Sequence, residues 1–228
     1  IFLFCRSLGF QGYNEMKIAL AKATATASPV ALKLEPGIDT QTLCNHAYTM
    51  AVEALNATRN VLDPEAVDHA ATLLQRARQV YCLGQGGSQV LAGDIWARFS
   101  MLSTKFRTAG DSHMQAITAS LMGPEDVVLF ISYSGCTRDM MDTLHLAKDN
   151  GAKVILITHY DDAPGAALAD VVLLCGATES PLDSGSIPAK LAMLFVANVL
   201  VLRYTLDNQE LANLSLSRTS QALGGKLL

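Results

Sequence analysis

The composition of this 228-residue chain indicates a folded globular protein and argues against several other classes. Half of its residues are hydrophobic and 17% are charged, so the chain can bury a sizeable core and is not intrinsically disordered. Its formal net charge of −4 argues against a protein whose whole surface binds nucleic acid.

The five cysteines are widely spaced and form no C-x-x-C pair. Such a set is typical of reduced thiols in a cytoplasmic protein, and we expect neither a metal site nor a cofactor. Cys82 and Cys175 lie in apolar runs, where we expect them to be buried and inert. Because the chain starts at Ile1 and lacks the pattern of a signal peptide, we expect it to be an internal cut of a longer protein.

The N-terminal quarter of the chain is expected to be helical, with one linker. We expect a short helical end, then a turn that contains two glycines, and then a helix over residues 13–25, where apolar residues recur at helical spacing. Residues 28–39 include two prolines and a glycine, which is typical of a linker, and residues 40–60 form a long amphipathic helix. We therefore divide the chain into a helical segment (1–27), a linker with a long helix (28–61) and a main domain (62–228).

After Pro64 the sequence alternates between apolar runs and helical patterns. Helices are expected from about Gln89, near Gln115 and from Thr137, and a short helix is expected near Ala166. Strands that are apolar throughout and separated by helices predict an α/β domain with a three-layer, doubly wound, five-stranded parallel sheet. The expected strands are QVYCLG (79–84), KFRTAG (105–110), VVLFIS (127–132), KVILIT (153–158) and VVLLC (171–175).

One further run, over residues 191–202, is the most apolar helical stretch of the chain. It is much shorter than the roughly 20 residues that a membrane span needs. We therefore expect a core or interface helix and no membrane partner.

Two strand-to-helix loops carry the residue types that bind phosphate. In open α/β sheets, ligands bind where the strands end, and the loops 84–88 (GQGGS) and 132–137 (SYSGCT) both lie there. Glycines allow close backbone approach, and hydroxyl groups at a helix N-terminus suit an anion. Glycine turns also occur for purely geometric reasons, and Thr137 is suited to be an ordinary helix cap. Since one cap is enough, Ser132 and Ser134 remain for a phosphate ligand.

A dinucleotide site is the main competing interpretation of the first loop. Gly84-Gln85-Gly86 begins like G-x-G-x-x-G, and Asp111 could mimic the acid that binds ribose. However, Gln89 occupies the sixth position, where a small residue is needed, and no G-K-[ST] sequence marks a P-loop. The sequence therefore argues against a nucleotide, and a phosphate group remains the expected ligand of the two loops.

The segments LGQGGS, DSHMQ, ISYSGCTRD and KVILIT together resemble the sugar isomerase (SIS) domain, which would extend from about Leu62 to Arg203. The spacing around DSHMQ is similar to that in the RpiR family of bacterial transcriptional regulators. The segment FCRSLGFQGYNEMKIALAKA resembles the end of that family's N-terminal helix-turn-helix (HTH) domain. The resemblance thus covers almost the whole chain.

The resemblance implies a set of ligand residues. Ser88, Ser132, Ser134 and Thr137 would hold the phosphate of a sugar phosphate, in loops shaped by Gly86, Gly87 and Gly135. Asp111 and His113 would lie near the sugar hydroxyls, and Glu179 would close over the ligand. For His113 and Glu179, a polar loop residue without ligand contact is the alternative.

The resemblance also implies a function, with alternatives. It suggests a DNA-binding transcriptional regulator whose SIS domain senses a sugar phosphate; a phosphosugar isomerase and a binding subunit of a larger assembly are the alternatives. Isomerisation needs a base, for which His113, His159 and Glu179 are conceivable. None lies in a recognisable catalytic motif, and Cys136 stands where some SIS enzymes have an acidic or amide residue. We therefore expect a sensor without catalytic residues.

The expected partners are a sugar phosphate, operator DNA and further copies of the chain. Arg6 and Lys17 are weak candidates for contacts with DNA phosphates. A homodimer or tetramer is expected, with residues 40–60 and 189–202 as candidate subunit contacts. Our hypothesis is that the effector shifts the placement of two subunits and so alters the spacing of their DNA-reading domains.

Overall fold

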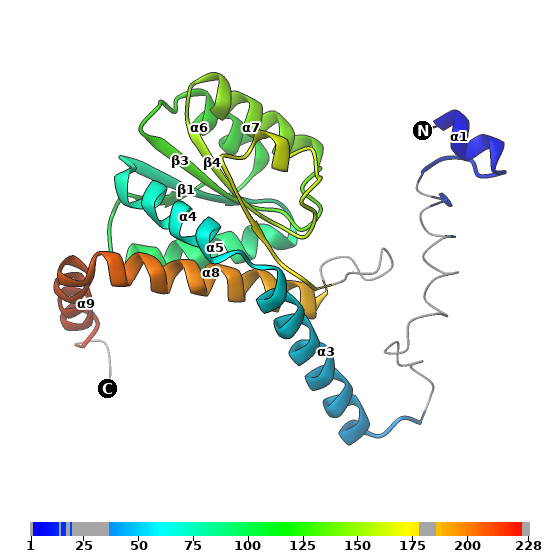
Figure 1. Cartoon of the computed structure of the whole chain (residues 1–228), viewed down its shortest axis with the longest axis horizontal. Helices are drawn as coiled ribbons and strands as arrows, with labels where there is room; N and C mark the ends of the chain where they lie inside the picture. Colours follow the sequence, from blue (N-terminus) through cyan, green and yellow to red (C-terminus); the bar gives the residue numbers. More distant parts are fainter. Residues whose placement is uncertain (1, 14, 17–18, 20–36, 178–185, 225–228) are drawn as a thin grey trace.

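The computed structural model describes residues 2–13, 15–16, 19, 37–177 and 186–224. Its centre is a five-stranded, all-parallel sheet in the order β2-β1-β3-β4-β5 (Figure 1). This confirms the α/β class and all five expected strands. The strands are β1 (Gln79–Gly84), β2 (Phe106–Thr108), β3 (Asp126–Ile131), β4 (Lys153–Thr158) and β5 (Val171–Leu174).

Helices cover both faces of the sheet and create the three layers. Along β3, Leu129 packs into a core with α4 (Pro64–Arg76), α5 (Gly87–Ser100) and α8 (Ile187–Asp207). The next residue, Phe130, packs on the opposite face with α6 (Ser112–Ser120) and α7 (Arg138–Asp149). Because successive side chains of a strand point to opposite faces, a strand that is apolar throughout requires this double cover.

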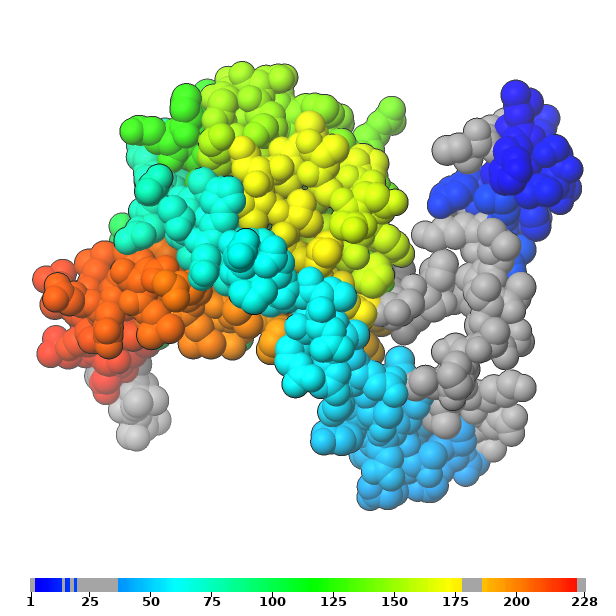
Figure 2. Space-filling view, viewed as in Figure 1, coloured from blue at the N-terminus to red at the C-terminus, as the bar shows by residue number. Residues whose placement is uncertain are grey.

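The long helix predicted over residues 40–60 is α3 (Thr40–Val61). Its C-terminal half packs on α8, whereas its N-terminal half stands clear of the domain (Figure 2). Residues 40–50 are accordingly exposed or half-buried, including Tyr48, which is 72% exposed. The carboxylate of Asp39 caps the helix by accepting a hydrogen bond from the backbone N–H of Thr42.

Some features differ from the sequence-based expectation. Helices α4 and α9 (Gln209–Gly224) were not expected, although Asp63 and Pro64 form a cap and first turn that are typical of a helix start. Strand β2 is shorter than the expected run 105–110. Two short elements agree with expectation: the helical end before the first turn is α1 (Phe2–Ser7), and the short helix near Ala166 is a 3-10 helix, η1 (Ala166–Leu168).

Much of the N-terminal region lies outside the described residues. Most of the expected helix over residues 13–25 and most of the expected linker over residues 28–39 lie outside the described residues. The domain boundaries 1–27, 28–61 and 62–228 therefore stay predictions.

Helix α8 is the single helix among the described residues that is long and apolar enough, by length and composition, to cross a membrane. In this fold it is a core helix. Seven of its side chains are buried: Ala189, Ala192, Met193, Val196, Ala197, Leu200 and Tyr204.

The cysteines predicted to be buried are buried. Cys82 in β1 is 0% exposed and Cys175, directly after β5, is 1% exposed. Burial raises the pKa of the Cys82 thiol to about 12, so the reactive thiolate is scarce at neutral pH.

Asp170 should make the stability of the domain depend on pH. Its carboxylate accepts hydrogen bonds from Lys148 Nζ (2.7 Å), Lys153 Nζ (3.0 Å) and the backbone N–H of Val154 (2.9 Å). Partial burial acts to raise the pKa of Asp170, but these three bonds outweigh it and hold the pKa below the ordinary value of 3.8. Because the folded pKa is the lower one, Asp170 stabilises the fold above an unfolded pKa of about 3.9. That stability is lost as the pH falls through the folded pKa.

We therefore expect Asp170→Asn to lower the melting temperature at pH 7, with the difference from wild type narrowing below about pH 4. Thermal melts across this range test the expectation, with the exposed Asp149→Asn as control. A difference that stays constant down to strongly acidic pH would show that the carboxylate charge is not the cause.

Candidate functional site

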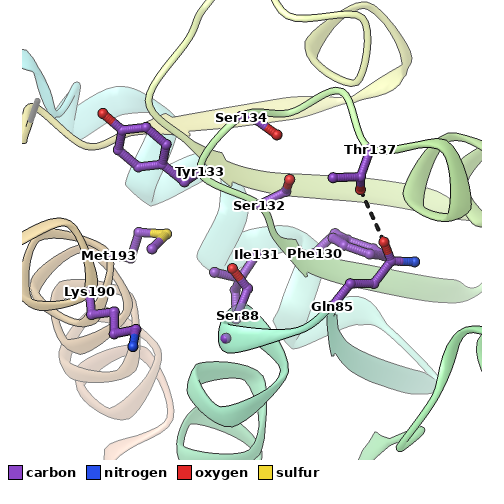
Figure 3. Close-up of a pocket in the computed structure, with 11 residues that line it drawn as sticks. Gln85, Ser88, Phe130, Ile131, Ser132, Tyr133, Ser134, Thr137, Lys190 and Met193 are labelled. Atoms are coloured by element: carbon purple, nitrogen blue, oxygen red, sulfur yellow. Dashed lines mark hydrogen bonds between the residues drawn. The ribbon is translucent and has the colours of Figure 1, made fainter. Parts of the chain in front are cut away.

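A cavity of about 320 Å³ opens where β1 and β3 end, between the N-termini of α5 and α7 and the first turns of α8 (Figure 3). This is the position at which ligands bind in open parallel sheets. Both predicted loops contribute to it. The lining residues are Gln85, Gly87, Ser88, Phe130, Ile131, Ser132, Tyr133, Ser134, Thr137, Lys190 and Met193.

The first loop connects β1 to α5 through a backbone that requires glycine. Gly86 has a φ of 54°, in the left-handed region that other residues rarely adopt. At Gly84, an added Cβ would lie 2.6 Å from the carbonyl oxygen of Ser88. This tight turn brings Gly87 and Ser88 to the cavity, and within the described residues the Ser88 hydroxyl has no hydrogen-bond partner in the chain.

The second loop is a compact turn that presents hydroxyl groups. Ser132 is buried, and its Oγ accepts a hydrogen bond from the backbone N–H of Gly135 (3.2 Å). Gly135 has a φ of 59°, and its carbonyl oxygen accepts a bond from the N–H of Gly165 (2.8 Å). The turn directs Ser134 into the cavity, and the described part of the chain offers its hydroxyl no partner.

Thr137 is the N-cap residue of α7, but its hydroxyl does not cap the helix. It donates instead to Oε1 of Gln85 at 3.0 Å, so that a hydrogen bond joins the two loops (Figure 3). The α7 terminus therefore keeps N–H groups that no side-chain cap satisfies, which is the arrangement that suits an anion.

Gln85 was not among the predicted site residues. Its Nε2 atom is buried and has no hydrogen-bond partner among the described residues. Flipping the amide by 180° would exchange Oε1 and Nε2 of Gln85. One of the two atoms would still lack a hydrogen-bond partner among the described residues, because Thr137 reaches only one of them. A ligand oxygen beside Gln85 would supply the missing partner. The sequence signal for Gln85 was weak, because a glutamine between glycines in a strand-to-helix loop has no residue pattern that marks it as a ligand residue.

Lys190 is the other residue that the sequence reasoning missed as a ligand residue. It lies in the first turn of α8, and an added Cβ at Gly87 would be 3.6 Å from its Cε and 4.0 Å from its Nζ. Its ammonium group forms no ion pair within the described residues. The available signal was the single charge in the run from Ile187 to Leu202, in which Asn198 is the one other polar residue.

Other predicted residues lie away from this cavity. Asp111 caps α6 by accepting a bond from the N–H of Met114 (2.8 Å), and His113 is exposed on the same helix. Neither lines the cavity. Arg6 is exposed on α1, whereas Lys17 and Glu179 lie outside the described residues.

His159, one of the three conceivable bases, makes contacts within the fold instead of facing the cavity. Its Nδ1 lies 2.8 Å from the carbonyl oxygen of Cys175, and its ring stacks on Tyr133 with centroids 4.9 Å apart. The neighbouring carbonyl identifies Nδ1 as the protonated nitrogen. His159 is not one of the residues that line the cavity.

The electrostatics of the cavity favour an anion. Two helix N-termini and the Lys190 ammonium group meet there, and no Asp or Glu is among its described lining residues. The cavity can therefore hold a phosphate with hydroxyl donors around it, beside an apolar wall that includes Met193.

Comparison with known proteins agrees with this geometry. The family model described as the SIS domain matches residues 73–203. The HTH-type transcriptional regulator HexR of Pseudomonas aeruginosa is 32% identical over 209 residues, which cover 89% of this chain and 71% of HexR. The HTH-type transcriptional regulator RpiR of Escherichia coli K12 is 29% identical over 214 residues, covering 93% of this chain and 72% of RpiR.

Solved structures share the fold. The Vibrio vulnificus NanR protein, complexed with ManNAc-6P, matches with a TM-score of 0.84 and 23% identity, over 98% of this chain and 79% of NanR. The sugar isomerase domain of the RpiR transcription factor from Sphaerobacter thermophilus matches with a TM-score of 0.72 and 26% identity, over 78% of this chain and 98% of that domain. Given the matched SIS domain and the regulators that the chain resembles along most of its length, it belongs to the RpiR family of HTH-type transcriptional regulators.

Proposed function

We propose that this chain is the effector-sensing part of a transcriptional regulator and that its cavity binds a sugar phosphate. The observation that carries the proposal is the convergence on one cavity of two helix N-termini with the Ser88 and Ser134 hydroxyls and the Lys190 ammonium group, which have no partner among the described residues. Hydroxyl and backbone N–H donors at helix N-termini, together with a cation, are the groups that bind phosphate in proteins.

The phosphate would lie between the two loops, with Ser88 on one side and Ser132, Ser134 and Thr137 on the other. Lys190 would neutralise part of its charge, and Gln85 would donate its unused N–H to a ligand oxygen. A volume of about 320 Å³ is at the lower end of the range for small-molecule sites. It suits a monosaccharide phosphate better than a dinucleotide.

We propose a sensor and not an isomerase. The described lining residues include no His, Asp or Glu that could take a proton from a sugar carbon. The relatives named above are regulators, which points the same way. Turnover of a sugar phosphate by the purified protein, lost in Glu179→Gln or His113→Ala, would overturn the sensor in favour of the isomerase.

A thermal-shift screen tests the effector class. Glucose 6-phosphate, fructose 6-phosphate, ribose 5-phosphate and ManNAc-6P would be compared with the corresponding unphosphorylated sugars. A ligand that binds only the folded state adds about 2.7 kcal/mol of stability at a hundredfold excess over its dissociation constant. We expect a rise in melting temperature with a phosphorylated sugar alone, and its loss in Ser134→Ala.

The matched control is Ser220→Ala, which removes an exposed hydroxyl on α9, outside the cavity. This variant should keep the full shift. Equal shifts with phosphorylated and free sugars, or a full shift in Ser134→Ala, would contradict the phosphate anchor.

We further propose a cytoplasmic homodimer or tetramer that binds operator DNA through the N-terminal part of the protein. Exposed apolar side chains support subunit contacts through α3 and the C-terminal helices: Leu43, Tyr48, Leu202, Leu206, Leu211 and Leu214. Arg6 and Lys17 stay candidates for contacts with DNA phosphates. Sedimentation as a monomer at micromolar concentration would overturn the subunit arrangement.

A further inference from the structure

Tyr133 connects the second ligand loop to the segment that follows β5. It lies between Ser132 and Ser134 in the sequence, and in Figure 3 its side chain extends away from Thr137. Its hydroxyl donates to the carbonyl oxygen of Ala177 at 2.8 Å. The bond spans 44 residues of sequence, so it joins two parts of the fold that no local turn connects.

The Tyr133 ring strengthens the same connection. It stacks on His159 with an interplanar angle of 4°, and the His159 imidazole is bonded to the carbonyl oxygen of Cys175. Two carbonyl groups of the segment 175–177 are thus held by aromatic side chains that pack on each other. A displacement of the ligand loop would therefore be passed to this segment.

The segment 175–177 in turn is fixed to α3. The N–H of Gly176 donates to Oγ1 of Thr58 at 3.1 Å, and the Thr58 hydroxyl donates to the carbonyl oxygen of Ala54 at 2.7 Å. Gly176 is so close to the helix that an added Cβ would lie 2.3 Å from the carbonyl carbon of Ala57. Backbone contacts backbone here, with no flexible side chain in between to absorb a shift.

We infer that Tyr133 is a positioning residue that transmits occupancy of the phosphate loop to α3, by way of Ala177, Gly176 and Thr58. The inference rests on the proposed phosphate site and adds a route for its regulation. A phosphate bound by Ser132 and Ser134 fixes the backbone on both sides of Tyr133. Occupancy therefore favours one position of the Tyr133 hydroxyl, and a ligand shifts an equilibrium only through such a difference between states.

The geometry of α3 would amplify the movement. The helix is held near Thr58 by the Gly176 hydrogen bond, and its N-terminal half projects from the domain (Figure 2). Its first residue, Thr40, is the end nearer in sequence to the proposed DNA-binding segment 1–27. At 1.5 Å per residue, the start of the helix at Thr40 is roughly 27 Å from Thr58. A rotation of about 5° at Thr58 would therefore move Thr40 by roughly 2 Å.

Hydrogen–deuterium exchange of the ligand-free protein tests the connection without any effector. We expect Tyr133→Phe, which keeps the ring and removes the hydroxyl, to speed amide exchange in residues 54–61 of α3 by at least about fivefold, the lower end of typical coupling between sites. Exchange in α7, which follows the same loop, should change less. The control is Tyr160→Phe, because the Tyr160 ring also packs edge-on against Tyr133 and His159 and its hydroxyl makes no hydrogen bond to the described residues.

Inorganic phosphate tests transmission from the site itself. In the wild type, phosphate should slow exchange in residues 54–61 of α3. In Thr58→Val, which removes the acceptor of the Gly176 bond at a position outside the cavity, phosphate should still raise the melting temperature but leave α3 exchange unchanged.

The two arms separate the inference from the proposed function. Equal exchange in Tyr133→Phe and Tyr160→Phe overturns the connection, whether or not phosphate binds. Binding of phosphate to wild type with no effect on α3 also overturns the transmission. If neither phosphate nor any sugar phosphate binds, the proposed function is overturned and the transmission with it. Exchange in the ligand-free Tyr133→Phe and Tyr160→Phe variants still decides whether Tyr133 holds α3.

Discussion

Gly176→Ala should lower the free energy of unfolding by about 3 kcal/mol, the upper end of the usual cost of overpacking a core. The new methyl group would lie 2.3 Å from the carbonyl carbon and 2.4 Å from the carbonyl oxygen of Ala57, and 2.7 Å from the nitrogen of Thr58. These are backbone atoms of a helix, which cannot rotate away as the end of a side chain can. Urea unfolding followed by circular dichroism gives the free energy directly.

Gly93→Ala is the matched control for this substitution. Gly93 lies inside α5, and an added Cβ there would meet no atom within 4 Å. Because alanine is the better helix former, we expect this variant to gain about 0.5 to 1 kcal/mol. If Gly176→Ala were as stable as wild type, α3 and the segment after β5 would not be in backbone contact, and the transmission route would lose its basis.

Lys190→Met should weaken phosphate binding by about tenfold to a hundredfold, corresponding to about 1.5 to 3 kcal/mol for a hydrogen bond to a charged group. Methionine keeps most of the length of the side chain and packs beside Met193, so the loss would come from the missing charge. Titration calorimetry with inorganic phosphate and with the sugar phosphate that gives the largest thermal shift would measure the effect.

Lys190→Arg serves as the charge-preserving control and should retain most of the affinity, because the guanidinium also donates to phosphate. The dependence of binding on salt should decrease in Lys190→Met and persist in Lys190→Arg. Unchanged affinity in Lys190→Met would place the phosphate away from the start of α8.

The sequence was sufficient to predict the sheet because each strand carries its own signal. β3 and β4 are apolar on both faces, a pattern that only a covered parallel strand requires. β2 was overestimated, because a run that ends in Thr108, Ala109 and Gly110 does not show where pairing with β1 stops.

The phosphate loops were also predictable, since their hydroxyls and glycines are close together in the sequence. Ser88, Ser132, Ser134 and Thr137 all line the cavity, although their contact with a ligand is still a prediction. Thr137 occupies the expected N-cap position of α7. Its hydroxyl bonds to Gln85 of the other loop instead of to the backbone of its own helix.

Residues that reach the site from far along the chain were not predictable. Lys190 meets Gly87 only because α8 packs on α5, and no local pattern encodes that contact. Asp111, in contrast, was predicted as a ligand residue and does not line the cavity. A carboxylate at the start of a helix fits both a cap and a ligand residue, and the structure uses it as a cap.

The short edge strand β2 limits how far the sheet can pair with another chain. An edge strand exposes unpaired N–H and C=O groups that can pair with another chain. β2 has only three residues, Phe106–Thr108, and it pairs with β1 alone. The exposed Arg107 places a positive charge at this edge, and the indole N–H of Trp96 donates to the carbonyl oxygen of Phe106. At this edge of the sheet, so short a strand offers another chain only a few backbone groups to pair with.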